Sequence, residues 1–150
     1  MFNNIREKRI NKIKENIVTF CKLTCDQIDK NEMRMGNGLF NRRCHLNAIQ
    51  QVKEGKMEEV YSCICLEKDA DPIIHFINKD KDGFFVDNTL GWGYELCDYY
   101  IIKKVNEDQY NNTYKMLTEL KKYYFDTFIR KFNQKLLCRI LNIKYDNIGI

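Results

Sequence analysis

The chain has 150 residues, a length typical of one domain, and 44% of them are hydrophobic, which is enough for a buried core. This composition excludes an intrinsically disordered chain. The net charge of +4 is mild, and no apolar run approaches the length of a membrane-spanning helix. We therefore expect a single domain, residues 1–150, that does not enter a membrane.

The cysteines and the N-terminal segment point to a reducing compartment. The chain has seven cysteines, and an odd number cannot pair completely within one chain. The first residues, MFNNIREKRINKIKEN, lack the apolar stretch of a signal peptide. We therefore expect a cytoplasmic protein with free thiols.

The first elements in chain order are two helices with a loop between them. Apolar residues recur at spacings of three and four from about Asn4 to Lys30, which predicts an amphipathic helix. Gly36-Asn37-Gly38 indicates a loop before Arg43. A short helix is predicted from Cys44 to about Glu54, with Gly55 as its stop signal.

The middle of the chain then changes to the period of β-strands. Alternating side chains predict a strand over Val60–Leu66, and a second strand is expected over Ile73–Asn78. Asp82-Gly83 is a hairpin signal, so the strand Phe84–Asp87 should pair with the one before it. A further strand is predicted over Tyr99–Val105.

Helical periodicity returns near Asn106 and continues as one long helix, with a break expected before Leu141. The order of elements is thus helix, short helix, three or four antiparallel strands, and long helix. We expect an α+β fold, in which long N- and C-terminal helices pack on one side of a small antiparallel sheet.

Three residues in this order favour nucleophilic catalysis. Cys44 opens a predicted helix, where unpaired backbone N–H groups lower the pKa of a thiol. His75 lies in a short apolar strand, and Asp87 ends the next strand. A thiol, a base and an acid that orients the base are the parts of a cysteine nucleophile.

The contact between His75 and Asp87 depends on the hairpin turn. With a two-residue turn at Asp82-Gly83, Lys81 would pair with Phe84, and position 90 would lie opposite His75. A longer loop or a bulge would bring Asp87 alongside instead. The spacing permits the contact and leaves the register open.

An acyl-transfer site also needs donors to the negatively charged oxygen of the intermediate. The backbone N–H of Cys44 is one candidate, and the side-chain amide of Asn37 or Asn41 is a second, with Asn37 preferred because it lies in the glycine loop. His45 lies about 100° around the helix from Cys44, which suits substrate contact better than the role of base. Trp92, between two glycines, is a candidate for lining the site or packing in the core.

Two stretches resemble the transglutaminase-like and papain-like superfamily of cysteine enzymes. One runs through His75-Phe76-Ile77-Asn78 and continues at Gly83-Phe84-Phe85-Val86-Asp87-Asn88-Thr89-Leu90-Gly91. The other, Arg43-Cys44-His45-Leu46-Asn47, resembles the nucleophile helix of arylamine N-acetyltransferases, which share that fold. The matched region runs from Asn41 to Gly93, about a third of the chain.

The resemblance implies a papain-like or transglutaminase-like core in which Cys44 is the nucleophile, His75 the general base and Asp87 the orienting acid. It implies a protease, amidase, transglutaminase or acyltransferase that works through a thioester. The chain departs from the family in two ways. Only 30 residues separate Cys44 from His75, and Asn41-Arg42-Arg43 replaces the usual tryptophan-rich approach to the nucleophile.

Simpler interpretations of the same residues stay open. Cys44 and His75 are also compatible with core positions, and Asp87 with an ordinary turn at a strand end. Cys63 and Cys65, taken with nearby histidines, lack the spacing of a common structural zinc site, so we expect no metal and no cofactor. The alternative function is an inactive binding or inhibitory protein on the same scaffold, of phage or mobile-element type, that engages a host protein or nucleic acid through its basic helices.

Basic residues on the two terminal helices set the expectations for partners. They are compatible with solvated helix faces and with a surface for an acidic partner. No nucleic-acid-binding motif accompanies them, so we do not expect nucleic acid to be the ligand. For the enzyme hypothesis, the partner is a protein, peptide or other amide substrate; the oligomeric state stays open. The basic residues of the first helix are Arg6, Lys8, Arg9, Lys12 and Lys14, and those of the last are Lys115, Lys121, Lys122, Arg130, Lys131, Lys135, Arg139 and Lys144.

Overall fold

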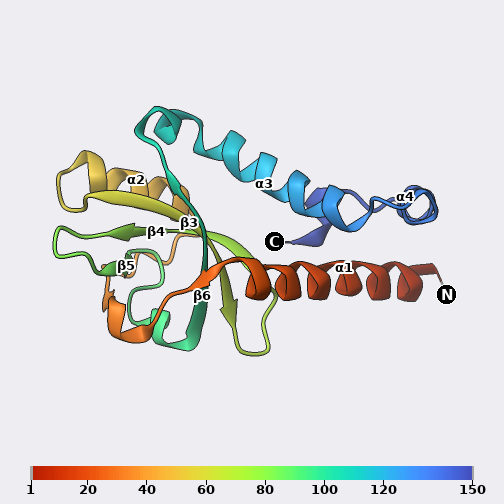
Figure 1. The fold of residues 1–150 in the computed structure, drawn as a ribbon, viewed down its shortest axis with the longest axis horizontal. Helices are drawn as coiled ribbons and strands as arrows, with labels where there is room; N and C mark the ends of the chain where they lie inside the picture. Colours follow the sequence, from red (N-terminus) through yellow and green to blue (C-terminus); the bar gives the residue numbers. More distant parts are fainter. Residues whose placement is uncertain (1, 150) are drawn as a thin grey trace.

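A computed structural model describes residues 2–149, which form an α+β fold (Figure 1). The α-helices in that range are α1 (Phe2–Thr24), α2 (Cys44–Lys53), α3 (Thr113–Phe128) and α4 (Phe132–Ile140). The strands are β1 (Asp26–Gln27), β2 (Met33–Met35), β3 (Glu59–Glu67), β4 (Ile73–Lys79), β5 (Phe85–Asp87) and β6 (Cys97–Val105). Short 3-10 helices are η1 (Lys30–Glu32), η2 (Gly91–Leu96), η3 (Glu107–Asn112) and η4 (Tyr145–Ile148).

The six strands form one curled, mixed sheet in the order β1-β6-β3-β4-β5-β2. Its centre is antiparallel, because β3 pairs with both β4 and β6. The edge strand β2 runs parallel to β5, with Met33 opposite Phe85. The expectation of a small antiparallel sheet was therefore wrong in both size and strand direction.

The two edge strands explain this difference. The predicted helix Asn4–Lys30 ends at Thr24, and β1 follows it by pairing with Ile101 and Tyr100 of β6. Thr24, Cys25 and Asp26 are weak helix formers, so sheet pairing prevails there over helical periodicity. β2 lies within a stretch that carried no strand pattern, since three residues are too few to show one.

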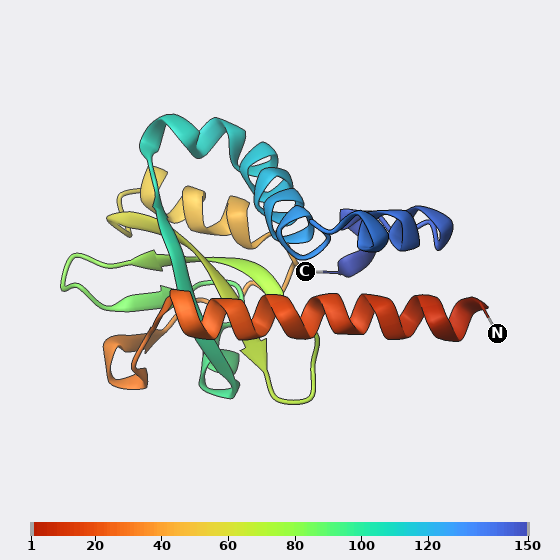
Figure 2. The same cartoon turned by 45° about the vertical axis from the view of Figure 1, so that its right-hand side comes forward.

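The C-terminal region also differs from the single long helix predicted from Asn106. It begins with η3, continues as α3, and breaks at residues 129–131 before α4. The break lets Cys138 and Leu141 join the core that Phe125 and Ile129 already occupy. The chain therefore turns back along α1 (Figures 1 and 2). Arg6 of α1 donates a hydrogen bond to the carbonyl of Leu141 there (3.2 Å).

The sheet separates two apolar clusters of unequal size. The larger one fills the space between the helices and one sheet face, where Ile13 and Ile17 of α1 meet Phe76 of β4. The smaller one covers the opposite face and includes Cys63 and Tyr99. Among residues 2–149, no helix combines the length and apolar character needed to cross a bilayer.

Candidate active site

Cys44 is the first residue of α2, so its side chain lies at the N-terminal end of a ten-residue helix. The first amide of that helix to close a backbone turn is that of Asn47, which bonds to the carbonyl of Arg43 (2.9 Å). The N–H groups of the first turn have no partner inside a helix and give that end a partial positive charge. The thiol is half-buried, which leaves a route from solvent.

His75 lies on β4 and is buried, with 2% of its surface exposed. Its Nε2 atom is 2.7 Å from Oδ2 of Asp87, which lies at the end of β5 and is fully buried. The structure thus brings His75 and Asp87 together in a direct contact. Because Nε2 faces Asp87, Nδ1 is the ring nitrogen that remains for the thiol.

The hairpin between β4 and β5 explains this contact. The loop is not the two-residue turn considered above, because the amide of Asp80 bonds to the carbonyl of Phe84 (2.9 Å) and Gly83 has a φ of +89°. Three residues, 81–83, therefore form the loop, a type that uses glycine in this region of φ. This register pairs Asn78 with Val86 and Lys79 with Phe85. One position further it sets Asp87 opposite Ile77, so Asp87 is a diagonal neighbour of His75 on the same sheet face.

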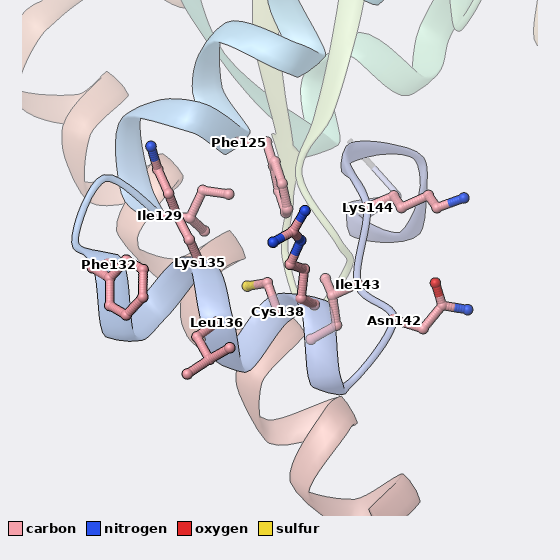
Figure 3. Close-up of a pocket in the computed structure, with 10 residues that line it drawn as sticks. Phe125, Ile129, Phe132, Lys135, Leu136, Cys138, Asn142, Ile143 and Lys144 are labelled. Carbon is pink, nitrogen blue, oxygen red and sulfur yellow. The ribbon is translucent and has the colours of Figure 1, made fainter.

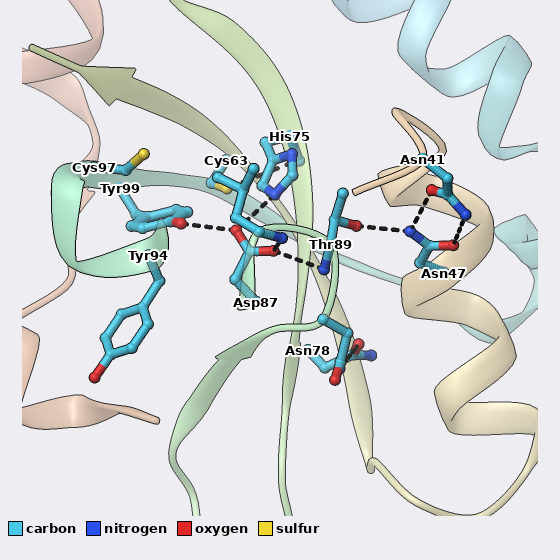
Figure 4. A network of polar contacts seen from close by, with 12 residues as sticks. Asn41, Asn47, Cys63, His75, Asn78, Asp87, Thr89, Tyr94, Cys97 and Tyr99 are labelled. Atoms are coloured by element: carbon cyan, nitrogen blue, oxygen red, sulfur yellow. Dashed lines mark hydrogen bonds and ion pairs between the residues drawn. The ribbon is translucent and has the colours of Figure 1, made fainter. Parts of the chain in front are cut away.

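Asp87 has four hydrogen-bond partners. Besides His75, its Oδ2 atom accepts a bond from the hydroxyl of Tyr99 (2.7 Å), and its Oδ1 atom accepts one from the amide of Thr89 (2.9 Å; Figure 4). The amide of Leu90 also donates to Oδ1 (2.8 Å). Burial raises the pKa of Asp87, but these partners, His75 above all, hold it below its ordinary value. The carboxylate is therefore ionised and fixed in place.

The Cys44 thiol lies beside β4, near the side chain of His75 and the backbone amide of Phe76. Burial is the largest influence on this thiol and raises its pKa. Contacts with His45, His75 and the Phe76 amide outweigh burial and lower the pKa to about 6. At neutral pH the favoured species is the thiolate.

The imidazole of His75 responds in the opposite sense. Burial lowers its pKa, but the carboxylate of Asp87 and the sulfur of Cys44 both favour the charged ring, and the pKa rises to about 10. Between pH 6 and 10 the site therefore holds a thiolate next to an imidazolium. This pair supplies both a nucleophile and an acid for a leaving group.

A network of side-chain amides fixes α2 against the strand end that carries Asp87. Asn47 of α2 donates to Oγ1 of Thr89 (2.9 Å) and to Oδ1 of Asn41 (2.8 Å; Figure 4). Asn78 of β4 donates to the carbonyl of Ala48 in α2 (2.8 Å) and accepts from the amide of Asn88 (3.0 Å). These bonds join the elements of Cys44, His75 and Asp87 into one unit.

The loop before α2 approaches Asp87 through a glycine. A Cβ atom added at Gly36 would lie 2.3 Å from the carbonyl oxygen of Asp87. Further along, the amides of Leu39 and Phe40 bond to the carbonyls of Asn88 (3.0 Å) and Thr89 (2.8 Å). The loop therefore stays hydrogen-bonded to the segment after β5 as far as Phe40.

The four further candidates lie in different places. The Asn37 side chain donates to Gln51 (3.4 Å), about two helical turns from Cys44, so the structure does not bring it to the thiol. Asn41 exchanges hydrogen bonds with Asn47 at the start of α2. His45 packs edge-on against Phe76, and it lowers the pKa of the neighbouring Cys44 thiol. Trp92 of η2 is 63% exposed and does not belong to the core.

Tyr99 is the site residue that sequence reasoning missed. The sequence placed it only at the start of a predicted strand, yet it is 1% exposed and reaches Asp87 from β6. β3 and β4 lie between β6 and β5 in the sheet, so only the curl of the sheet brings Tyr99 to Asp87. No local pattern in the sequence encodes that curvature.

Within residues 2–149, no group of three or more histidine, cysteine, aspartate or glutamate side chains is arranged to hold a metal ion. Comparisons of the chain with protein-family profiles, curated protein sequences and solved structures return no match. Cys44, His75 and Asp87 are therefore the features of this chain that bear on its function.

Proposed function

We propose that this protein is a cysteine-dependent acyl-transfer enzyme, a hydrolase or acyltransferase with a papain-like or transglutaminase-like arrangement of its site. The observation that carries the proposal is the buried His75–Asp87 pair, 2.7 Å between Nε2 and Oδ2, next to a thiol at a helix N-terminus. The lowered pKa of Cys44 and the raised pKa of His75 support it, because both favour the reactive ion pair.

The first half of the reaction forms a thioester. The Cys44 thiolate attacks the carbonyl carbon of an amide or ester, a C–S bond forms, and the carbonyl electron pair moves to oxygen. The backbone N–H of Cys44 is the candidate hydrogen-bond donor to that negatively charged oxygen. Nδ1 of His75 then gives its proton to the leaving amine or alcohol, and the bond to the leaving group breaks.

The second half releases the acyl group. Water or an amine attacks the thioester while the now neutral His75 takes its proton, and the C–S bond breaks to return the thiolate. Asp87 keeps its negative charge throughout and holds the ring so that Nδ1 faces the sulfur. The choice between water and an amine decides between hydrolysis and acyl transfer.

A trapping experiment tests the proposal. Incubation with p-nitrophenyl acetate at pH 7, followed by acid quenching and peptide mass spectrometry, should show an acetyl group on Cys44. Cys44→Ala and His75→Ala should remove this adduct while the circular dichroism spectrum stays unchanged. Cys25→Ala, at the other half-buried thiol, should leave it intact. Acetylation of Cys44 that is no faster than that of Cys25 would contradict the proposal.

A second candidate function is binding of an acidic protein segment, and it rests on a groove at the C-terminal end of the chain. We call it the α4 groove; it has a volume of about 430 Å³ and lies between α3, α4 and the segment that follows (Figure 3). Apolar Phe132 and Leu136 remain exposed along it, while Lys135, Arg139 and Lys144 add positive charge. Its lining contains no carboxylate, so charge complementarity favours an acidic partner with an apolar anchor.

Binding at the α4 groove is tested with a synthetic helical peptide that carries one phenylalanine flanked by glutamates. NMR shifts on titration should fall on α4, and Arg139→Glu should abolish them, whereas Lys22→Glu on α1 should not. A peptide with lysine in place of glutamate is the charge control. Absence of NMR shifts with the acidic peptide would contradict this function. So would a protein that binds phosphatidylserine vesicles and does not bind the peptide.

A further inference from the structure

A second groove lies next to the candidate active site, between α2 and the corner formed by η3 and α3. We call it the α2 groove, and its volume of about 570 Å³ is in the range of ligand-binding sites. Cys44 itself does not line this groove, but its two neighbours in sequence, Arg43 and His45, do, so the groove begins beside the start of the helix that carries the reactive sulfur. The residues that line it are Asn41, Arg43, His45, Leu46, Asn47, Ile49, Gln50, Lys53, Tyr110, Asn111, Thr113 and Tyr114.

The charged groups of the α2 groove are all cationic. Arg43 directly precedes Cys44, and Lys53 ends the helix, where its ammonium group lies 3.5 Å from Oδ1 of Asn111. No carboxylate lines the groove, and among residues 2–149 neither cation forms an ion pair. The nearest acid in sequence, Glu54, is paired with Lys56 (2.6 Å).

The length of the α2 groove sets the size of its ligand. Ten residues of α-helix separate Arg43 from Lys53, a distance of about 15 Å. An extended peptide advances about 3.3 Å per residue, so about four or five residues span the two cations. Between them, exposed Leu46 and Tyr114 provide an apolar surface on which a hydrophobic side chain can pack.

We propose that the α2 groove binds an acidic peptide segment of the substrate, with carboxylates at Arg43 and Lys53 and an apolar side chain between them. This inference rests on the proposed function, because it assigns to Cys44 the carbonyl that such a peptide presents. The cations act by charge complementarity at a partly solvated surface, so the preference weakens as salt is added. The substrate class is therefore an acidic peptide or protein segment, not a small neutral amide.

Two matched alkylating peptides test this inference. One is iodoacetyl-Gly-Glu-Glu-Phe-Glu-amide, and the other has glutamine in place of each glutamate. The second-order rate of Cys44 alkylation is followed for each by mass spectrometry at pH 7. The ratio of the two rates cancels any change in thiolate fraction, so it reports only on recognition of the peptide.

The ratio should be about tenfold in favour of the glutamate peptide at low salt and fall severalfold in 0.5 M NaCl. Arg43→Gln and Lys53→Gln should each lower it severalfold, whereas Lys122→Gln, an exposed lysine elsewhere on α3, should not. Fast alkylation by both peptides at equal rates would overturn the inference and leave the proposed function standing. Slow alkylation of Cys44 by both would overturn the two together.

Discussion

The role of Asp87 depends on how completely its carboxylate is surrounded. A fully buried carboxylate without partners would take up a proton, but His75, Tyr99 and two backbone amides keep this one ionised. The negative charge in turn keeps His75 protonated, and His45 together with the His75 imidazolium lowers the pKa of Cys44. The reactivity of the partly exposed Cys44 thiol thus depends on the fully buried Asp87.

Asp87→Asn tests that dependence. The amide has nearly the same shape but no charge, so the imidazolium loses its main stabilising partner and the pKa of Cys44 should rise. Alkylation of Cys44 by iodoacetamide at pH 6 should slow by about tenfold or more, which corresponds to a pKa rise of at least about one unit. An unchanged rate with an unchanged fold would show that Asp87 does not act on the thiol.

Tyr99→Phe removes one donor from Asp87 and leaves the other three. A hydrogen bond to a charged group is worth about 2 kcal/mol, so the free energy of unfolding in urea should fall by about that amount. The pH profile of Cys44 alkylation should move to higher pH, which a purely structural role would not cause. Tyr100→Phe is the control, because that hydroxyl makes no hydrogen bond among residues 2–149 and its ring faces the other cluster.

At the level of secondary-structure elements, the site depends on three features: the segment before α2, the end of β5, and the loop between β4 and β5. The segment before α2 passes against the end of β5, where Gly36 leaves no space for a side chain. The three-residue loop at Gly83 then sets the register that places His75 and Asp87 on one face. The geometry of the site is therefore a property of these connections as much as of the sheet.

Gly36→Ala should displace the end of β5, because the new Cβ would lie 2.3 Å from a backbone carbonyl that cannot rotate away. We expect Cys44 alkylation at pH 6 to fall by about tenfold and the protein to lose about 2 kcal/mol of stability. Gly93→Ala, whose Cβ would make only an ordinary 3.6 Å contact with Leu90, is the matched control. Equal effects from the two substitutions would contradict this role for Gly36.

The elements that could be predicted from the sequence are those long enough to show a period, together with β5, which the hairpin signal at Asp82-Gly83 marks. The strands β3, β4 and β6 each have at least seven residues, and α2 begins at the predicted Cys44. The strands β1 and β2 have two and three residues, and their existence depends on partners far away in the chain. The break between α3 and α4 has a tertiary cause too, since it carries Cys138 into the core.

The same distinction holds for the candidate site. Cys44, His75 and Asp87 could be chosen because each chemical type stands at a recognisable place in a helix or strand. Tyr99 and Asn47 could not, because their contacts depend on sheet curl and on the packing of α2 beside Thr89. The hairpin register was open for a related reason, as Asp82-Gly83 is compatible with loops of two and of three residues.

At the scale of the whole molecule, α1 stabilises the sheet by packing on one of its faces. Its apolar stripe packs on the face opposite the His75–Asp87 pair, and Ile13 and Ile17 are almost fully buried there. The C-terminal segment packs on the same helix. The cluster that stabilises the fold thus lies on one face of the sheet, where Cys44 of α2 also packs, and the His75–Asp87 pair lies on the other face.

Ile17→Ala should lower the free energy of unfolding by about 2–4 kcal/mol, because it removes buried methyl groups from a core that cannot fully collapse. Leu23→Ala, in the same helix but at a side chain that is 80% exposed, should change it by less than about 0.5 kcal/mol. Urea denaturation followed by circular dichroism measures both. Similar losses in the two variants would contradict the assigned face of α1.

The most direct measurement of the central claim is the rate at which Cys44 is alkylated between pH 4 and 11. The pKa of Cys44 is lowered, so the thiolate should appear as the pH rises through about 6; the pKa of His75 is raised, so the ion pair should persist until about pH 10. At pH 6 half of Cys44 is then thiolate, against about 0.3% of a free cysteine of pKa 8.5. A thiolate of lower pKa is also a weaker nucleophile, and this reduces the rate advantage of Cys44 over free cysteine by about tenfold.

The account therefore predicts that at pH 6 iodoacetamide reacts with Cys44 about tenfold faster than with free cysteine, and that His75→Gln removes this advantage. Cys25, the other half-buried thiol, provides the internal reference in the same mass-spectrometric experiment. A Cys44 profile with a single rise near pH 8.5, unchanged in His75→Gln, would contradict the ion pair and the function proposed from it.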